Sequence, residues 1–64
     1  MDQLPTTEAE AEELGFFDAV EARDAGEYNC AACFARCPWR ATDGSMVHHP
    51  LAVAYIVGWK NVLL

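Results

Sequence analysis

The last fourteen residues of the chain, LAVAYIVGWKNVLL, are apolar on nearly every face of a helix, and Lys60 is their only charged residue. A segment of this kind has to be covered by the rest of the chain, by a second copy or by a partner. The whole chain has 64 residues, and a domain of that size buries only about 60% of the surface of its unfolded chain. The segment therefore predicts self-association or a partner groove, within one small domain that spans residues 1–64.

Helix and strand compete for this segment. Pro50 suits the first position of a helix, whereas the run from Val53 to Val57 is rich in residues that favour strands. We prefer a helix from Pro50 to about Leu63, because the segment is long and begins at a proline. Its continuous apolar run, Leu51 to Val57, is too short to cross a bilayer, so we expect no membrane partner.

The first half of the chain has the pattern of a capped helix that follows a flexible lead-in, residues 1–6. Thr7 and Glu10 form a capping-box pair, and good helix formers follow them. Gly26 either stops this helix or only weakens it, and Cys37-Pro38 ends it, because a residue before proline avoids the helical conformation. The predicted fold is mainly α: a small helical hairpin with a long or broken first helix from about Thr7 to Arg36, a Cys-Pro-Trp loop and an apolar second helix.

The expected core of this hairpin takes residues from both helices and from the loop. Its predicted members are Leu14, Phe17, Val20, Cys33, Phe34, Trp39, Tyr55, Ile56, Trp59 and Val62.

The net charge of −6 is distributed unevenly along the chain. Residues 1–27 hold nine acids and one arginine, which gives −8, and residues 28–64 hold one acid and three bases, which gives +2. An acidic front half repels phosphate backbones, so we expect no direct contact with nucleic acid. It suits solubility or docking on a basic protein surface, and a solvated helix face is the simpler interpretation. The N-terminus has no secretory pattern, so the expected location is the cytoplasm.

Three cysteines, Cys30, Cys33 and Cys37, are spaced i, i+3 and i+7, which places them on one face of a single helix. The simplest interpretation is three free thiols in the core, because unpaired cysteine behaves as a small hydrophobic residue. The second interpretation is a Zn²⁺ site, in which His48 or His49 supplies a fourth ligand to the three thiolates. The third is an iron–sulfur cluster, since the spacing and Pro38 are similar to the end of a bacterial ferredoxin run.

We expect no cofactor if the thiols are core residues, and Zn²⁺ if they are ligands. No base–nucleophile set and no phosphate loop is evident in the sequence, so the prediction is that the chain is not an enzyme. A cysteine nucleophile paired with His48 or His49 is the remaining catalytic alternative, because such pairs form in space rather than in sequence.

Several short motifs also resemble those of the ribosome modulation factor group of very small two-helix proteins. They are Gly26, Ala31-Ala32, Cys37-Pro38-Trp39 and Ala54-Tyr55-x2-Gly58-Trp59, and the likeness covers Gly26 to Asn61. The resemblance implies a helical hairpin in which Trp39 and Trp59 help the helices to pack. The stretch between the two tryptophan motifs is longer here, and this chain is acidic where the ribosome binders are basic, so binding to ribosomal RNA is not carried over.

The function predicted from these features is that of a small adaptor or inhibitor, with a mobile element as one origin, that docks on a partner protein. Aromatic residues dominate interface energetics, so Trp39, Tyr55 and Trp59 are the expected anchors. The acidic helix would contribute Glu10, Glu13 and Glu21. The alternative is a mini-domain stabilised by zinc, and a homo-oligomer is compatible with either.

Overall fold

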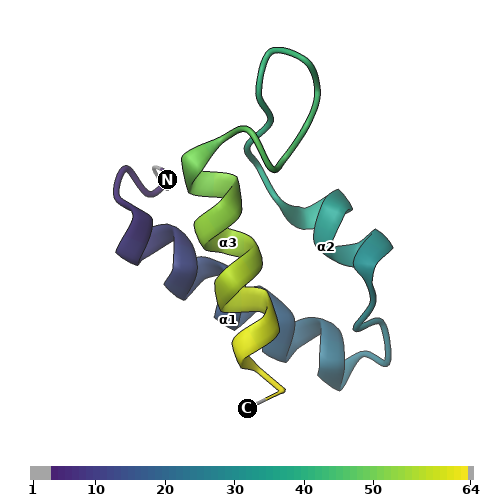
Figure 1. The fold of residues 1–64 in the computed structure, drawn as a ribbon. Helices are drawn as coiled ribbons and strands as arrows, with labels where there is room; N and C mark the ends of the chain where they lie inside the picture. Colours follow the sequence, from purple (N-terminus) through teal and green to yellow (C-terminus); the bar gives the residue numbers. More distant parts are fainter. Residues whose placement is uncertain (1–3, 64) are drawn as a thin grey trace.

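A computed structural model describes residues 4–63 and contains three helices: α1 (Glu8–Asp24), α2 (Cys30–Arg36) and α3 (Pro50–Asn61). In Figure 1, α3 crosses over α1, α2 lies to one side of α3, and a long loop connects α2 to the start of α3. The mainly helical fold is confirmed, as is the helix that begins at Pro50. No strand occurs in residues 4–63, so the strand alternative for the apolar segment is wrong.

Each helix begins at a side chain that accepts a hydrogen bond from a free backbone N–H, which is the usual role of an N-cap residue. The Thr7 hydroxyl accepts from the N–H of Glu10 at 3.2 Å, and the Asn29 side chain accepts from the N–H of Ala32 at 2.7 Å. His49 caps α3, because its Nδ1 accepts from the N–H of Leu51 at 3.2 Å. The predicted start of the first helix at Thr7 is confirmed.

Gly26 decides between the long and the broken form of the first helix. Its φ of 74° is left-handed, a conformation that glycine adopts without steric cost. The N–H of Glu27 then donates to the carbonyl of Ala22 at 2.7 Å, and the N–H of Gly26 donates to that of Arg23 at 3.0 Å. This pair of bonds is the Schellman ending of a helix, so the first helix is broken into α1 and α2.

The contact between α1 and α3 consists of small residues. On α1 the buried positions are Ala11, Gly15, Ala19 and Ala22, spaced four, four and three apart. The backbone of α3 lies so close to α1 that a Cβ on Gly15 would overlap the carbonyl of Tyr55, and one on Gly58 would overlap that of Glu12. Because the two backbones touch, no room remains between them for a phenylalanine.

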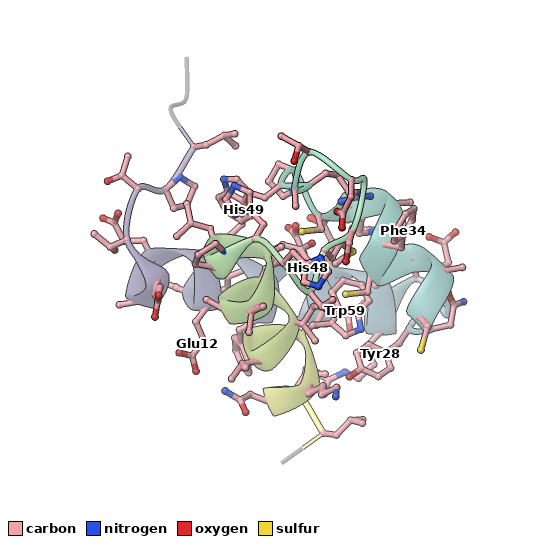
Figure 2. All side chains as sticks on the ribbon, turned by 45° about the horizontal axis from the view of Figure 1, so that its top comes forward. Glu12, Tyr28, Phe34, His48, His49 and Trp59 are labelled. Atoms are coloured by element: carbon pink, nitrogen blue, oxygen red, sulfur yellow. The ribbon has the colours of Figure 1, made fainter. Side chains whose placement is uncertain are left out.

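Two predicted core residues therefore lie on the surface. Phe17 is 59% exposed and Phe34 is 53% exposed. On α1 the small residues occupy the face that meets α3, which turns Phe17 outward, and the ring of Phe34 on α2 is only partly covered by the rest of the chain (Figure 2). The prediction for the other members holds better: four are buried, namely Cys33, Trp39, Tyr55 and Trp59, and four are partly buried, namely Leu14, Val20, Ile56 and Val62.

A row of aromatic rings fills the space between α3 and the α2 side of the molecule. The ring of Tyr28 stacks on Trp59 with a centroid distance of 5.3 Å, and Trp59 lies 6.2 Å from Tyr55. Trp39 meets the other side of Tyr55, edge to face at 6.2 Å. Aromatic pairs in these arrangements each contribute about 0.5–1.5 kcal/mol beyond the area that they bury.

Candidate interaction groove

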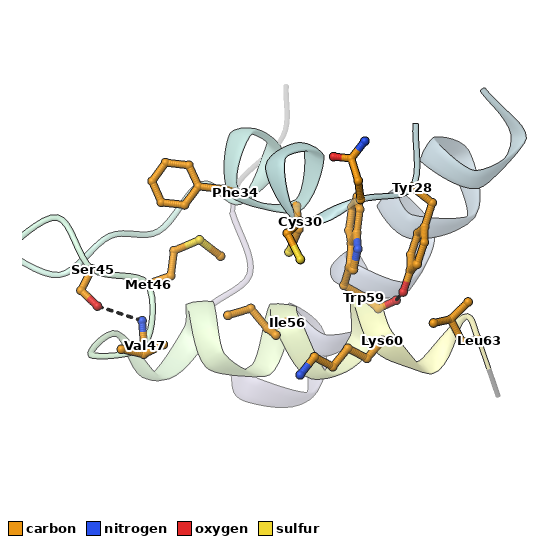
Figure 3. A pocket seen from close by; sticks show the side chains of 12 residues that line it. Tyr28, Cys30, Phe34, Ser45, Met46, Val47, Ile56, Trp59, Lys60 and Leu63 are labelled. Atoms are coloured by element: carbon orange, nitrogen blue, oxygen red, sulfur yellow. Dashed lines mark hydrogen bonds between the residues drawn. The ribbon is translucent and has the colours of Figure 1, made fainter. Parts of the chain in front are cut away.

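A groove of about 580 Å³ opens between α2, the loop at residues 45–47 and α3. Figure 3 shows α2 above it and α3 below, with the parallel rings of Tyr28 and Trp59 at one end and Met46 and Val47 at the other. Its lining residues, called the groove residues below, are Tyr28, Asn29, Cys30, Cys33, Phe34, Ser45, Met46, Val47, Ile56, Trp59, Lys60 and Leu63.

The end of the groove near Tyr28 is held rigidly. Besides stacking on the indole, the Tyr28 hydroxyl donates to the backbone carbonyl of Trp59 at 2.9 Å. Burial raises the pKa of this hydroxyl, and so would negative charge on Cys33 and Cys30. The phenol therefore stays protonated near neutral pH and keeps its role as a donor.

The other side of the groove is bounded by Phe34, and Arg40 fixes the backbone beside it. The Arg40 guanidinium lies 4.0 Å from the centre of the Phe34 ring, a cation–π geometry. The same group donates to the carbonyls of Cys37 and Trp39, each at 2.9 Å, and to the carbonyl of Phe34. One side chain thus satisfies the carbonyl of Phe34 in the last turn of α2 and two carbonyls that follow the helix.

The three cysteines are all free and occupy different environments. Cys30 is exposed at the start of α2, Cys33 is buried one turn later, and Cys37 is buried just after the helix ends. Burial, followed by the neighbouring thiols of Cys37 and Cys30, raises the pKa of Cys33 to about 11. The Cys37 thiol donates a long, weak bond of 3.7 Å to the carbonyl of Trp39. Cys30 and Cys33 belong to α2, and Cys37 is its C-cap residue, whose N–H still donates to the carbonyl of Cys33 at 3.0 Å before the backbone turns extended ahead of Pro38.

The two histidines serve separate local structures, and Figure 2 shows their rings well apart. His49 caps α3 through Nδ1, whereas the Nδ1 of His48 lies 2.8 Å from the carboxylate of Asp43. The backbone N–H of Ser45 lowers the pKa of Asp43, and His48 lowers it further. Within residues 4–63, no three side chains of His, Cys, Asp or Glu lie together as a metal ion would need, so the predicted zinc set is not assembled.

The three aromatic residues expected to anchor a partner are buried in the core. Tyr55 is 0% exposed, and Trp39 and Trp59 are also buried. The Tyr55 hydroxyl donates to the carboxylate of Asp18 at 2.6 Å, and burial together with that bond raises its pKa strongly. Trp59 still reaches the groove with one edge, whereas Trp39 and Tyr55 do not line it. Trp39 and Tyr55 are core residues, as the predicted core had them, and their role as partner anchors stays a prediction.

The acidic residues predicted to meet a partner do lie on the surface. Glu10, Glu13 and Glu21 are all exposed on α1. Glu21 accepts from Arg36 of α2 at 3.2 Å, and Glu27 accepts from the same guanidinium at 3.5 Å. Exposed pairs of this kind contribute roughly 0–1 kcal/mol each, so they help to orient α2 without fixing it.

Phe34 and Tyr28 are two of the groove residues that sequence reasoning misjudged or missed. Phe34 falls on the same helical stripe as the cysteines, which is why it is expected in the core. Nothing in the periodicity of the chain indicates that the ring of Tyr28 returns to α3. The break at Gly26 is the signal that could have found both, because a separate α2 needs to bury only one narrow face.

No family model, no curated protein and no solved structure matches the chain. None of the helices in the described part of the chain combines the length and the apolar character that crossing a membrane requires.

Proposed function

We propose that this chain is a small, non-enzymatic interaction module that docks on a partner protein through the groove between α2 and α3. The observation that carries the proposal is the groove itself. Its lining is almost entirely apolar, it is wide enough for one or two bulky side chains, and Phe34, Val47 and Leu63 stay exposed at its edges. Exposed apolar surface gathered in one concave place is typical of a site for another molecule.

The charge of the chain indicates the kind of partner. Glu10 and Glu13 are exposed on α1, and the chain as a whole carries −6. Lys60 is the one charged side chain among the groove residues, and its exposed ammonium group can stay in water. The proposed partner is therefore a protein segment with bulky apolar side chains for the groove, on a protein whose basic residues face the exposed acids of α1. Complementary charge of this kind speeds association more than it strengthens the complex.

The two exposed phenylalanines provide a matched test. Phe34→Asp places a charge at the groove, whereas Phe17→Asp places the same charge at a similarly exposed ring on α1, outside the groove. Circular dichroism first confirms that both variants keep their helices. Affinity capture with the tagged chain should then retain a partner on the original chain and on Phe17→Asp, and lose it on Phe34→Asp.

The affinity for the captured partner, measured by calorimetry, should fall at least about tenfold in Phe34→Asp, which corresponds to about 1.4 kcal/mol. Replacing Glu10 and Glu13 together by glutamine should mainly slow association. If both phenylalanine variants retain the same proteins, the partner does not bind in the groove and the proposal is wrong. If ultracentrifugation instead shows a dimer that Phe34→Asp dissociates, the occupant is a second copy of the chain.

A further inference from the structure

Two of the three cysteines, Cys30 and Cys33, stand apart from the third by their position. Both line the groove and belong to the first turn of α2, three residues apart. Cys37 is not a groove residue, and its thiol already donates to the carbonyl of Trp39. The structure thus presents an exposed thiol and a buried thiol beside one another, with a third thiol engaged elsewhere.

We infer that Cys30 and Cys33 form a dithiol site that reacts with small disulfides such as oxidised glutathione and closes to an intramolecular disulfide. This inference is independent of the proposed docking function, because it concerns only the chemistry of the two thiols.

The spacing of the two residues allows the bond. Residues three apart on a helix have Cβ atoms about 5–6 Å apart, and a disulfide needs about 3.5–4.5 Å. The first turn of α2 must therefore tighten by about 1–2 Å. Cys30 and Cys37 are seven residues apart, which is about 10 Å along a helix axis, so that pair lies out of reach.

The surroundings of α2 permit this tightening. The segment that precedes α2, residues 25–29, is not helical and contains Gly26 with its left-handed φ. The first turn is held by the Asn29 cap and by a bond from the N–H of Cys33 to the carbonyl of Asn29 at 3.1 Å. Helix α2 also packs much less extensively on α1 than α3 does. A small shift of this turn therefore leaves the crossing of α1 and α3 intact.

The reaction is two successive thiol–disulfide exchanges. The Cys30 thiolate, which is accessible from solvent, attacks one sulfur of oxidised glutathione, and the first glutathione leaves as a thiolate that takes up a proton. The Cys33 thiol then gives its proton to water and attacks the Cys30 sulfur of the mixed disulfide, which releases the second glutathione. Two protein thiols are oxidised, and one small disulfide is reduced to two thiols.

Digestion with trypsin shows which two cysteines form the disulfide, because cleavage after Arg36 separates Cys37 from the other two cysteines. The reduced chain is treated with oxidised glutathione, its free thiols are alkylated, and the denatured product is digested. The expected result is a peptide of residues 24–36 that has lost two hydrogen atoms, together with alkylated Cys37. A cross-linked peptide that contains Cys37, a stable glutathione adduct on Cys30 or an unreacted chain would each overturn the inference.

Variants separate the two steps. Cys33→Ser should stop at the mixed disulfide and retain one glutathione on Cys30. Cys30→Ser should lose the fast uptake of glutathione and, because residue 30 is exposed, should keep its fold by circular dichroism. Cys37→Ala is the control and should still close the Cys30–Cys33 bond. Equal rates of glutathione uptake by Cys30→Ser and the original chain would show that Cys30 is not the attacking thiol.

Discussion

The crossing of α1 and α3 and the groove between α2 and α3 are built in opposite ways. At the crossing, glycines and alanines bring two backbones into direct contact, and its polar edges are tied by the bonds of Tyr55 to Asp18 at 2.6 Å and of Asn61 to Glu12 at 3.1 Å. At the groove, large side chains keep α2 away from α3 and leave space between them. Small residues thus allow α1 and α3 to pack backbone against backbone, whereas larger apolar side chains between α2 and α3 leave a groove.

The largest loss of stability is expected from a substitution at Gly58. Gly58→Ala would place a Cβ against the backbone of Glu12, where no side chain can move aside. We expect a loss of about 3 kcal/mol or more in the free energy of unfolding, measured with urea, at the upper end of overpacking effects.

The sign of this effect distinguishes packing from helix propensity. Replacing glycine by alanine inside a helix would otherwise stabilise the chain by about 1 kcal/mol. Ala9→Gly, at an exposed position of α1, is the control and should cost only about that amount. A neutral or stabilising Gly58→Ala would show that the two backbones are not in contact.

Two tyrosine hydroxyls differ in the acceptor that they bind, and one belongs to the crossing and the other to the groove. Tyr55→Phe removes a bond to a carboxylate and should cost about 2 kcal/mol. Tyr28→Phe removes a bond to a neutral carbonyl and should cost about 1 kcal/mol. Thermal unfolding of the two variants side by side measures the difference, and an equal or reversed order would contradict it.

Alkaline pH should lower the free energy of unfolding, because the folded chain raises the pKa of Cys33. Below pH 9 the thiol is protonated in both the folded and the unfolded chain, whereas between pH 9 and 11 only the unfolded chain releases the proton. A pKa that is raised in the folded state therefore gives a stability that declines across this window.

Unfolding under a reducing agent at several pH values checks this decline against Cys33→Ala. The raised pKa values of Tyr55 and Tyr28 act in the same direction in both proteins, so the difference between them reports the Cys33 thiol together with its smaller effect on these two hydroxyls. Parallel curves from pH 9 to 11 would mean that the folded chain does not hold the proton on Cys33.

The smallest effect on stability is expected at Phe34. Its ring is 53% exposed, so Phe34→Ala should change the free energy of unfolding by about 0.5 kcal/mol. Urea unfolding measures this, and Leu14→Ala, at a partly buried position that packs on the core, is the contrasting variant and should cost clearly more. A large loss in Phe34→Ala would place its ring in the core after all.

The sequence allowed the helices to be predicted, because their signals are local. Thr7 with Glu10, Cys37 with Pro38, and His49 with Pro50 each mark a helix end through contacts within a few residues. The core was predicted less well. Phe17 and Phe34 are apolar, and ranking residues by size places them inside, whereas the repeat of Ala11, Gly15 and Ala19 offers the smooth surface against which a backbone can pack.

The groove was foreseen only in outline. An apolar helix too large to be covered by so short a chain predicts a partner surface, and one side of that helix forms one wall of the groove. Its shape depends on the stack of Tyr28 on Trp59, which joins residues 31 positions apart. No pattern of spacing reports a contact of that range, and the same holds for the separation of the histidines from the cysteines.

The Arg40 guanidinium, which binds carbonyls at and after the end of α2, also affects how a protease would cleave the chain. A trypsin-like protease must draw an arginine side chain into its own pocket before it cuts. The side chain of Arg40 is engaged with three carbonyls and with the ring of Phe34. Cleavage after Arg40 therefore requires local unfolding of this segment. The rate of that cleavage in the native protein measures how often the end of α2 unfolds locally.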